Sequence, residues 1–276
     1  MRLVTIRTGS GTRAGRVEGD EVVLLDATDV RAVLEAPSGL SAAVDVGGPS
    51  VVWADTDLAP VIPRPDKTIC GGKNYLSHIA EMSGERPAHP TYFTKYARTL
   101  IGARDPISLP APDVSTSVDW EGELAIVIGS PVRDADPAEA LAAIAGFTVL
   151  NDVSVRDWQF RTSQFMAGTA FEGTTPLGPW LVTRDEVGDG TGLELRTEVD
   201  GVVKQSANTT DMCFTPVDIV IDLSRIITLD PGDVIATGTP SGVGHAREPR
   251  EYLTHGSVVK VSIEGVGEIE NRCVAG

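Results

Sequence analysis

The chain has 276 residues, and its 23 lysines and arginines against 39 aspartates and glutamates give a formal net charge of −16. Such acidity disfavours nucleic acid and anionic membrane surfaces as partners, because both require a basic face. Hydrophobic residues make up 41% of the chain, which is enough to bury a core and excludes a mostly disordered protein. No apolar run has the length of a signal peptide or a membrane span, so we expect a cytoplasmic protein.

Short strands dominate the predicted elements. Runs rich in Val, Ile and Thr predict strands over 3–7, 21–26, 123–129, 146–152, 180–183, 195–200 and 233–238, with a further pair at the carboxyl terminus. An Asp-Gly pair at 200–201 predicts a hairpin turn. Helices are predicted over 28–36, 74–82, 137–146 and 216–227. The proline-rich stretch 58–67 predicts a boundary between a small N-terminal α/β domain, residues 1–62, and a mostly β domain, residues 63–276.

Two glutamates lie at the start of the apolar strand in SVDWEGELAIVIG. Glu121 and Glu123 are two residues apart, so strand alternation points both carboxylates to one face. A third acid, Asp152, lies where the strand over 146–152 ends. These carboxylates form an all-oxygen set that suits Mg²⁺, Mn²⁺ or Ca²⁺. The alternative is two solvated glutamates at a strand edge.

The segment TICGGKNYLSHIAEM places His78 and Glu81 three residues apart, on one face of a predicted helix. A carboxylate beside an imidazole fixes its tautomer and raises its basicity, as a general base that activates water requires. The alternative is a surface pair that merely has helical spacing. Further along, Thr239 lies in a turn whose hydroxyl and backbone N–H groups could hold a carboxylate.

Taken in order, these segments resemble the fumarylacetoacetate hydrolase family over about residues 66–272. The resemblance rests on the motifs ICGGKNYLSHIAEM, FTKYARTLIGARDPISLP, DWEGELAIVIG, GFTVLNDVSVRDWQ, TPLGPWLVT, GVVKQSANTTDMCF and LDPGDVIATGTPSGVG. It implies a mostly β (α+β) fold of mixed rolled sheets with a few helices. It also implies a homodimer, a divalent cation, and 2-oxo acid or β-dicarbonyl substrates.

Carried over residue by residue, the resemblance implies metal ligation by Glu121, Glu123 and Asp152, and water activation by His78 and Glu81. Substrate contacts are expected from Thr239, Arg156, Gln159, Thr169 and Lys73. One position departs from the family, because Thr169 stands where many members carry a lysine before the TPLGP loop. A lysine would place a positive charge beside a developing oxyanion, whereas a hydroxyl offers only a hydrogen bond. Lys73, Lys95 and Arg156 are the alternatives for that charge.

The expected activity is metal-dependent hydrolysis of a carbon–carbon bond in an acylpyruvate-like or fumarylacetoacetate-like acid, with His78 deprotonating the attacking water. Decarboxylation or isomerisation (tautomerisation) of oxaloacetate-like 2-oxo diacids is the alternative, since it uses the same metal chemistry without an attacking water. The missing lysine favours that alternative. A catalytically weakened member that only binds a metabolite is the third. The expected cofactor is Mg²⁺, with Mn²⁺ or Ca²⁺ as alternatives, and the expected partners are a small anionic 2-oxo acid and a second copy of the chain.

Overall fold

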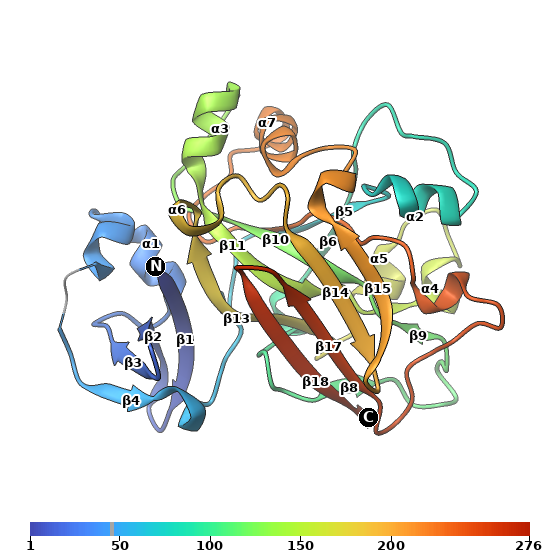
Figure 1. Ribbon diagram of the computed structural model, residues 1–276, viewed down its shortest axis with the longest axis horizontal. Coiled ribbons are helices and arrows are strands. Elements are labelled where there is room, and N and C mark those ends of the chain that lie inside the picture. The colour runs from blue at the N-terminus through green and yellow to red at the C-terminus, as the bar shows by residue number, and fades with distance from the viewer. Residues whose placement is uncertain (45–46) are drawn as a thin grey trace.

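The computed structural model describes residues 1–44 and 47–276, and strands predominate in it (Figure 1). One large sheet contains β1 (Arg2–Thr8), β2 (Gly11–Glu18), β3 (Glu21–Leu24), β4 (Ser50–Val52), β5 (Thr68–Gly72), β6 (Thr91–Lys95), β7 (Leu100–Ile101), β10 (Gly122–Ile128), β11 (Ile144–Asn151), β13 (Thr175–Thr183) and β16 (Val234–Ala236). Its order is β4-β3-β2-β1-β13-β11-β10-β16-β5-β6, with β7 parallel to β13.

Two further sheets complete the β structure of the described residues. One holds β8 (Ile107–Leu109), β14 (Glu194–Val199), β15 (Val202–Asn208), β17 (Val258–Ile263) and β18 (Gly267–Ala275), in the order β15-β14-β17-β18-β8. The other pairs β9 (Val118–Asp119) with β12 (Ser154–Val155). The expectation of a mostly β fold with a few helices is confirmed.

The helices are short and lie outside the sheets. They are α1 (Val30–Glu35), α2 (Leu76–Glu81), α3 (Pro137–Ala143), α4 (Arg156–Gln159), α5 (Met166–Thr169), α6 (Arg184–Val187) and α7 (Pro216–Ile226). In Figure 1, α2, α4 and α5 gather on one side of the molecule, with β1 to β4 and α1 on the other. No helix among the described residues is long and apolar enough to cross a membrane.

The centre of the large sheet is the antiparallel pair β10 and β11. Every residue of both strands is buried, which explains why their sequences are nearly continuous apolar runs. The predicted helix over 137–146 is too long, since α3 ends at Ala143 and the chain continues as β11. Gly146 is not a helix stop: a Cβ there would lie 1.9 Å from the carbonyl oxygen of Val182, so glycine permits β11 to approach β13.

The N-terminal segment extends the large sheet. Strand β1 pairs antiparallel with β13, Leu3 lying opposite Leu181. The residues of the predicted N-terminal domain therefore share a sheet with residues of the predicted larger domain (Figure 1). The division at residues 62 and 63 stays a prediction. The predicted hairpin is present, because Asp200 and Gly201 take positive φ values of 51° and 77° between β14 and β15.

Candidate functional site

The three acids predicted as metal ligands come together in the middle of the large sheet. Glu121 directly precedes β10, Glu123 lies in β10, and Asp152 directly follows β11. All three are buried, and each offers one carboxylate oxygen, these oxygens lying within 4.8 Å of one another. Adjacent antiparallel strands thus bring the two acidic segments to one place, as expected from strand alternation and the strand end.

The chemistry of this cluster fits a divalent cation. Neither carboxylate oxygen of Asp152 accepts an aligned hydrogen bond from the described residues, although both are fully buried. Burial raises the pKa of Glu123 well above its usual value, and the negative charges of Asp152 and Glu121 raise it further. Buried, mutually repelling carboxylates with unsatisfied oxygens require a positive charge between them. An all-oxygen donor set suits a hard cation such as Mg²⁺ or Mn²⁺.

One positive charge comes from the chain itself. The ammonium of Lys95, at the end of β6, lies 2.7 Å from Oδ1 of Asp152, and neither side chain is exposed. Its Nζ also donates to the carbonyl oxygen of Thr169 at 2.5 Å and to the hydroxyl of Thr175 at 2.9 Å. Two lysines were expected as substitutes for the missing lysine, and their positions differ. Lys95 is buried beside an acid of the cluster, whereas the side chain of Lys73 is exposed.

The guanidinium of Arg156 borders the cluster on another side. Its Nη2 lies 2.6 Å from Oε1 of Glu121, and its Nε donates to Oδ2 of Asp119 at 2.8 Å. Its Nη1 donates to Oε1 of Gln159 at 2.9 Å. Asp119, which the sequence prediction missed, therefore anchors Arg156. The signal was available, because Asp119 continues the two-residue spacing of Glu121 and Glu123.

His78 and Glu81 form the predicted pair on α2. Nδ1 of His78 lies 3.2 Å from Oε2 of Glu81, and both side chains are partly buried. Burial raises the pKa of Glu121, and among the charges that act on that carboxyl are those of Arg156, Asp152 and His78. The loop that binds Glu81 through Gly242 also binds Glu123 through Gly238, so the pair lies next to the acid cluster.

One loop, residues 238–245, ties these groups together through its backbone. The N–H of Gly238 donates to Oε2 of Glu123 at 2.8 Å, and that of Gly242 donates to Oε1 of Glu81 at 2.9 Å. The N–H of Gly244 donates to Oδ1 of Asp119 at 2.7 Å. The loop therefore fixes a candidate metal ligand, the partner of His78 and the anchor of Arg156 relative to one another.

The remaining predicted substrate contacts are buried polar groups around this loop and α4. The hydroxyl of Thr239 donates to the carbonyl oxygen of Gly122 at 3.0 Å and accepts from Nε2 of Gln205 at 2.8 Å. Gln205 was not predicted, although it lies in one of the motifs that carry the resemblance. The hydroxyl of Thr169 is directed to the carbonyl oxygen of Phe165 at 3.4 Å.

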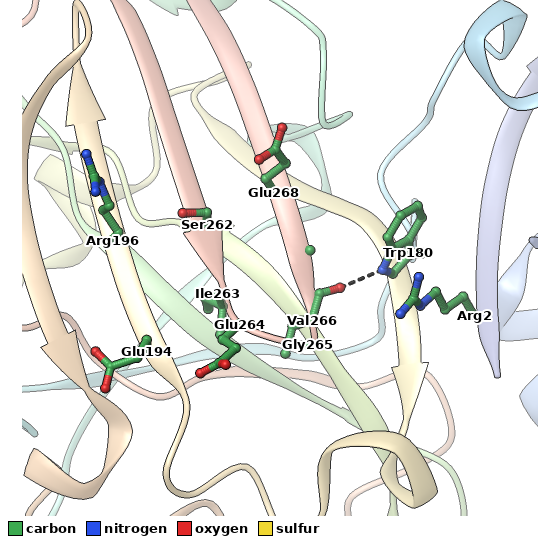
Figure 2. Close-up of a pocket in the computed structure, with 11 residues that line it drawn as sticks. Arg2, Trp180, Glu194, Arg196, Ser262, Ile263, Glu264, Gly265, Val266 and Glu268 are labelled. Carbon is green, nitrogen blue, oxygen red and sulfur yellow. Dashed lines mark hydrogen bonds between the residues drawn. The ribbon is translucent and has the colours of Figure 1, made fainter. Parts of the chain in front are cut away.

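A separate surface pocket of about 460 Å³ lies on the sheet that contains β14, β17 and β18 (Figure 2). Trp180 closes one side of it and donates to the carbonyl oxygen of Val266 at 2.5 Å. Its charged lining combines Arg2, Arg196, Glu194, Glu264 and Glu268. None of the predicted site residues lines this pocket, so it is distinct from the acid cluster.

Comparison with known proteins agrees with the motifs. The model of the fumarylacetoacetate (FAA) hydrolase C-terminal family matches residues 67–274. The human mitochondrial protein named oxaloacetate tautomerase FAHD2A is 45% identical over 221 residues, which cover 79% of this chain and 69% of the relative. The solved fumarylacetoacetate hydrolase of psychrophilic Exiguobacterium antarcticum superposes with a TM-score of 0.90 at 35% identity, and 100% of each chain is covered.

A further solved structure carries the name of an isomerase. The 5-carboxymethyl-2-hydroxymuconate delta-isomerase from Mycobacterium smegmatis gives a TM-score of 0.83 at 36% identity, with 100% of each chain covered. The family model alone spans well over half of the chain, and the human relative and both solved structures exceed 30% identity. This chain belongs to the fumarylacetoacetate hydrolase family of enzymes, whose members include isomerases and tautomerases.

Proposed function

We propose that the protein catalyses the metal-dependent tautomerisation of an oxaloacetate-like 2-oxo acid, interconverting its keto and enol forms. The observation that carries the proposal is the His78–Glu81 pair, a base beside a buried cluster of three carboxylates that suits a divalent cation. The name of the human relative, an oxaloacetate tautomerase, supports this choice of reaction. The alternative expected from the sequence thus has more support than carbon–carbon hydrolysis.

Tautomerisation moves one proton between C3 and the oxygen on C2. With Glu81 accepting the Nδ1 hydrogen of His78, Nε2 is unprotonated and can act as the base. Nε2 takes the C3 proton of the keto form, and the electrons of that C–H bond form the C2–C3 double bond. The former carbonyl oxygen gains the negative charge, and the imidazolium then returns a proton to it, which yields the enol.

The residues around the cluster fit this charge movement. A divalent cation held by Glu121, Glu123 and Asp152 would supply Lewis-acid stabilisation of the oxygen on C2. Arg156 adds a fixed positive charge beside Glu121. The neutral side chain of Thr169 matches a reaction without an attacking water, since hydrolysis must also stabilise a tetrahedral oxyanion.

The experiment follows interconversion of enol and keto oxaloacetate by the ultraviolet absorbance of the enol, with Mg²⁺, with Mn²⁺ and after chelation. We expect metal-dependent acceleration that His78→Ala removes. Hydrolysis is the second candidate, because the structural relative from Exiguobacterium is named a hydrolase. Acylpyruvates incubated in H₂¹⁸O separate the reactions: label in a product carboxylate indicates hydrolysis, and release of CO₂ from oxaloacetate indicates decarboxylation. If the protein hydrolyses acylpyruvates or decarboxylates oxaloacetate but does not accelerate the keto–enol exchange, the proposal is refuted.

The substrate class, the metal and the oligomeric state expected from the sequence are part of the same proposal. The substrate is a small anionic 2-oxo acid, the metal is Mg²⁺ or Mn²⁺, and the assembly is a homodimer. Sedimentation of the purified protein tests the dimer. The cytoplasmic location expected from the sequence remains a prediction, and the related human protein is named as mitochondrial.

A further inference from the structure

A second histidine lies beside the Arg156–Asp119 pair. His245 is in the short 3₁₀ helix Gly244–Ala246, and its backbone N–H donates to Oδ2 of Asp119 at 2.9 Å. The same oxygen accepts from Nε of Arg156 at 2.8 Å. One fully buried carboxylate therefore fixes His245 and Arg156 side by side.

The imidazole of His245 is held in a defined orientation. The hydroxyl of Tyr252 lies 2.9 Å from its Nδ1, and the ring centroid of Phe160 lies 5.1 Å from its own. With the Tyr252 hydroxyl donating to Nδ1, the ring hydrogen is on Nε2. Nε2 makes no hydrogen bond to any residue the structure describes, and Phe160 beside it is exposed. The partly buried ring thus offers an unused N–H donor.

The charges around this donor favour an anion. Burial lowers the pKa of His245, and the positive charges of Arg250 and Arg156 lower it further, so the ring is a neutral donor in a basic neighbourhood. The negative charge of Asp119 is already compensated: its two oxygens accept from Nε of Arg156 and from the backbone N–H groups of Trp120, Gly244 and His245.

Arg156 is buried and already faces the acids around the cluster. Its Nε and Nη1 donate to Asp119 and Gln159, whereas its Nη2, which makes no aligned hydrogen bond among the described residues, lies 2.6 Å from Oε1 of Glu121. A 2-oxo diacid that places its 2-oxo acid end at the carboxylate cluster would therefore need another donor for its second carboxylate. His245, whose backbone N–H is bound to the same Asp119 and whose side chain is partly buried, offers one such donor.

We infer that Nε2 of His245 binds the second carboxylate of the substrate and makes the enzyme selective for 2-oxo diacids over 2-oxo monoacids. This inference rests on the proposed function, because that function places the 2-oxo acid end at the cluster. Tyr252 is a positioning residue, since it holds the ring proton on Nε2.

The test compares two acids that differ at one group. Oxaloacetate and 2-oxobutanoate share the 2-oxo acid end, and a methyl group replaces the second carboxylate in the latter. Exchange of their C3 hydrogens in D₂O is followed by nuclear magnetic resonance with Mg²⁺ present. His245→Phe should lower kcat/KM for oxaloacetate about tenfold, as loss of a hydrogen bond to a charged group predicts, and change that for 2-oxobutanoate less than about twofold. His245→Gln, which keeps a terminal N–H, should restore part of the selectivity.

His255→Phe is the matched control, because His255 is exposed and its Nδ1 accepts from the backbone N–H of Ala275, away from Arg156. It should leave both rates unchanged. Equal losses for the two acids in His245→Phe, or an unchanged ratio, would overturn the inference. If the wild-type protein exchanges neither acid, the proposed function fails, and calorimetric binding of the two acids with Mg²⁺ decides the inference separately. A loss of affinity confined to oxaloacetate in His245→Phe supports it, and any other pattern refutes it.

Discussion

Lys95 and Asp152 form an ion pair from which solvent is excluded, with Nζ 2.7 Å from Oδ1 and neither side chain exposed. The ammonium also contacts the carbonyl oxygen of Thr169. Thr169 of α5, where the family resemblance leads one to expect a lysine, therefore supplies a backbone acceptor for Lys95 of β6. Because Lys95 is buried beside Asp152, its charge acts directly on the acids of the cluster.

Lys95→Met should destabilise the metal-free protein by about 3–5 kcal/mol, since it leaves Asp152 buried without its partner and next to two other carboxylates. The free energy of unfolding in denaturant, measured with a chelator present, checks this. Lys260→Met is the control: Lys260 pairs with Glu268 at the surface, and such pairs contribute less than about 1 kcal/mol. Equal losses in the two variants would contradict a special role for the buried pair.

Glu123→Gln should make the free energy of unfolding independent of Mg²⁺. Burial and the neighbouring acids disfavour the charged form of Glu123, so the neutral amide is expected to stabilise the metal-free protein while it removes a ligand. In the wild type, Mg²⁺ at 100 times its dissociation constant should add about 2.7 kcal/mol to the free energy of unfolding. Thermal unfolding with and without Mg²⁺ measures both effects, with exposed Glu264→Gln as the control. A variant that Mg²⁺ still stabilises fully would show that Glu123 is not a ligand.

The acid cluster and the His78–Glu81 pair could be predicted because each depends on local geometry. Strand alternation points Glu121 and Glu123 to one face, and one helical turn separates His78 from Glu81. Asp152 could be added because it ends a strand, although the sequence does not say which strand lies beside it. The structure supplies that answer by placing β11 next to β10.

The partners of Lys95, Asp119 and His245 could not be predicted, because each contact joins segments that only the tertiary structure brings together. Lys95 reaches Asp152 although β10, β16 and β5 lie between β11 and β6 in the large sheet, so strand order alone does not predict the contact. The pairing of β1 with β13 likewise depends on packing between distant segments. Strand propensity indicates where strands form. Which strands pair with one another depends on how the two faces of the sheet are buried.

Gly242→Ala should impair catalysis more than metal binding. Gly242 has a φ of +101°, and a Cβ there would lie 2.0 Å from the carbonyl oxygen of Lys204. The loop would have to shift, and Glu81 would lose the backbone N–H that positions it. We expect the free energy of unfolding to fall by about 1–3 kcal/mol and kcat to fall strongly, while Mg²⁺ binding is retained.

Gly256→Ala separates backbone strain from this effect on the site. Gly256 also has a positive φ, +92°, but a Cβ there would meet no atom within 4 Å. This variant should lose stability without a loss of kcat. If both variants lose kcat equally, the position of Glu81 does not depend on Gly242.

The stability of the protein should fall at acidic pH partly because of His245. Burial lowers the pKa of His245 below 6.5, so the unfolded chain binds its proton more readily than the folded protein does. The free energy of unfolding therefore rises with pH between the lowered pKa of His245 in the folded protein and about 6.5. The contribution of His245 is lost as the pH falls below about 6.5. His245→Phe removes the titrating group and keeps a ring against Phe160. Unfolding free energies of both proteins from pH 8 to pH 5 should show the wild type losing more stability than the variant, and parallel curves would mean that His245 titrates as it does in the unfolded chain.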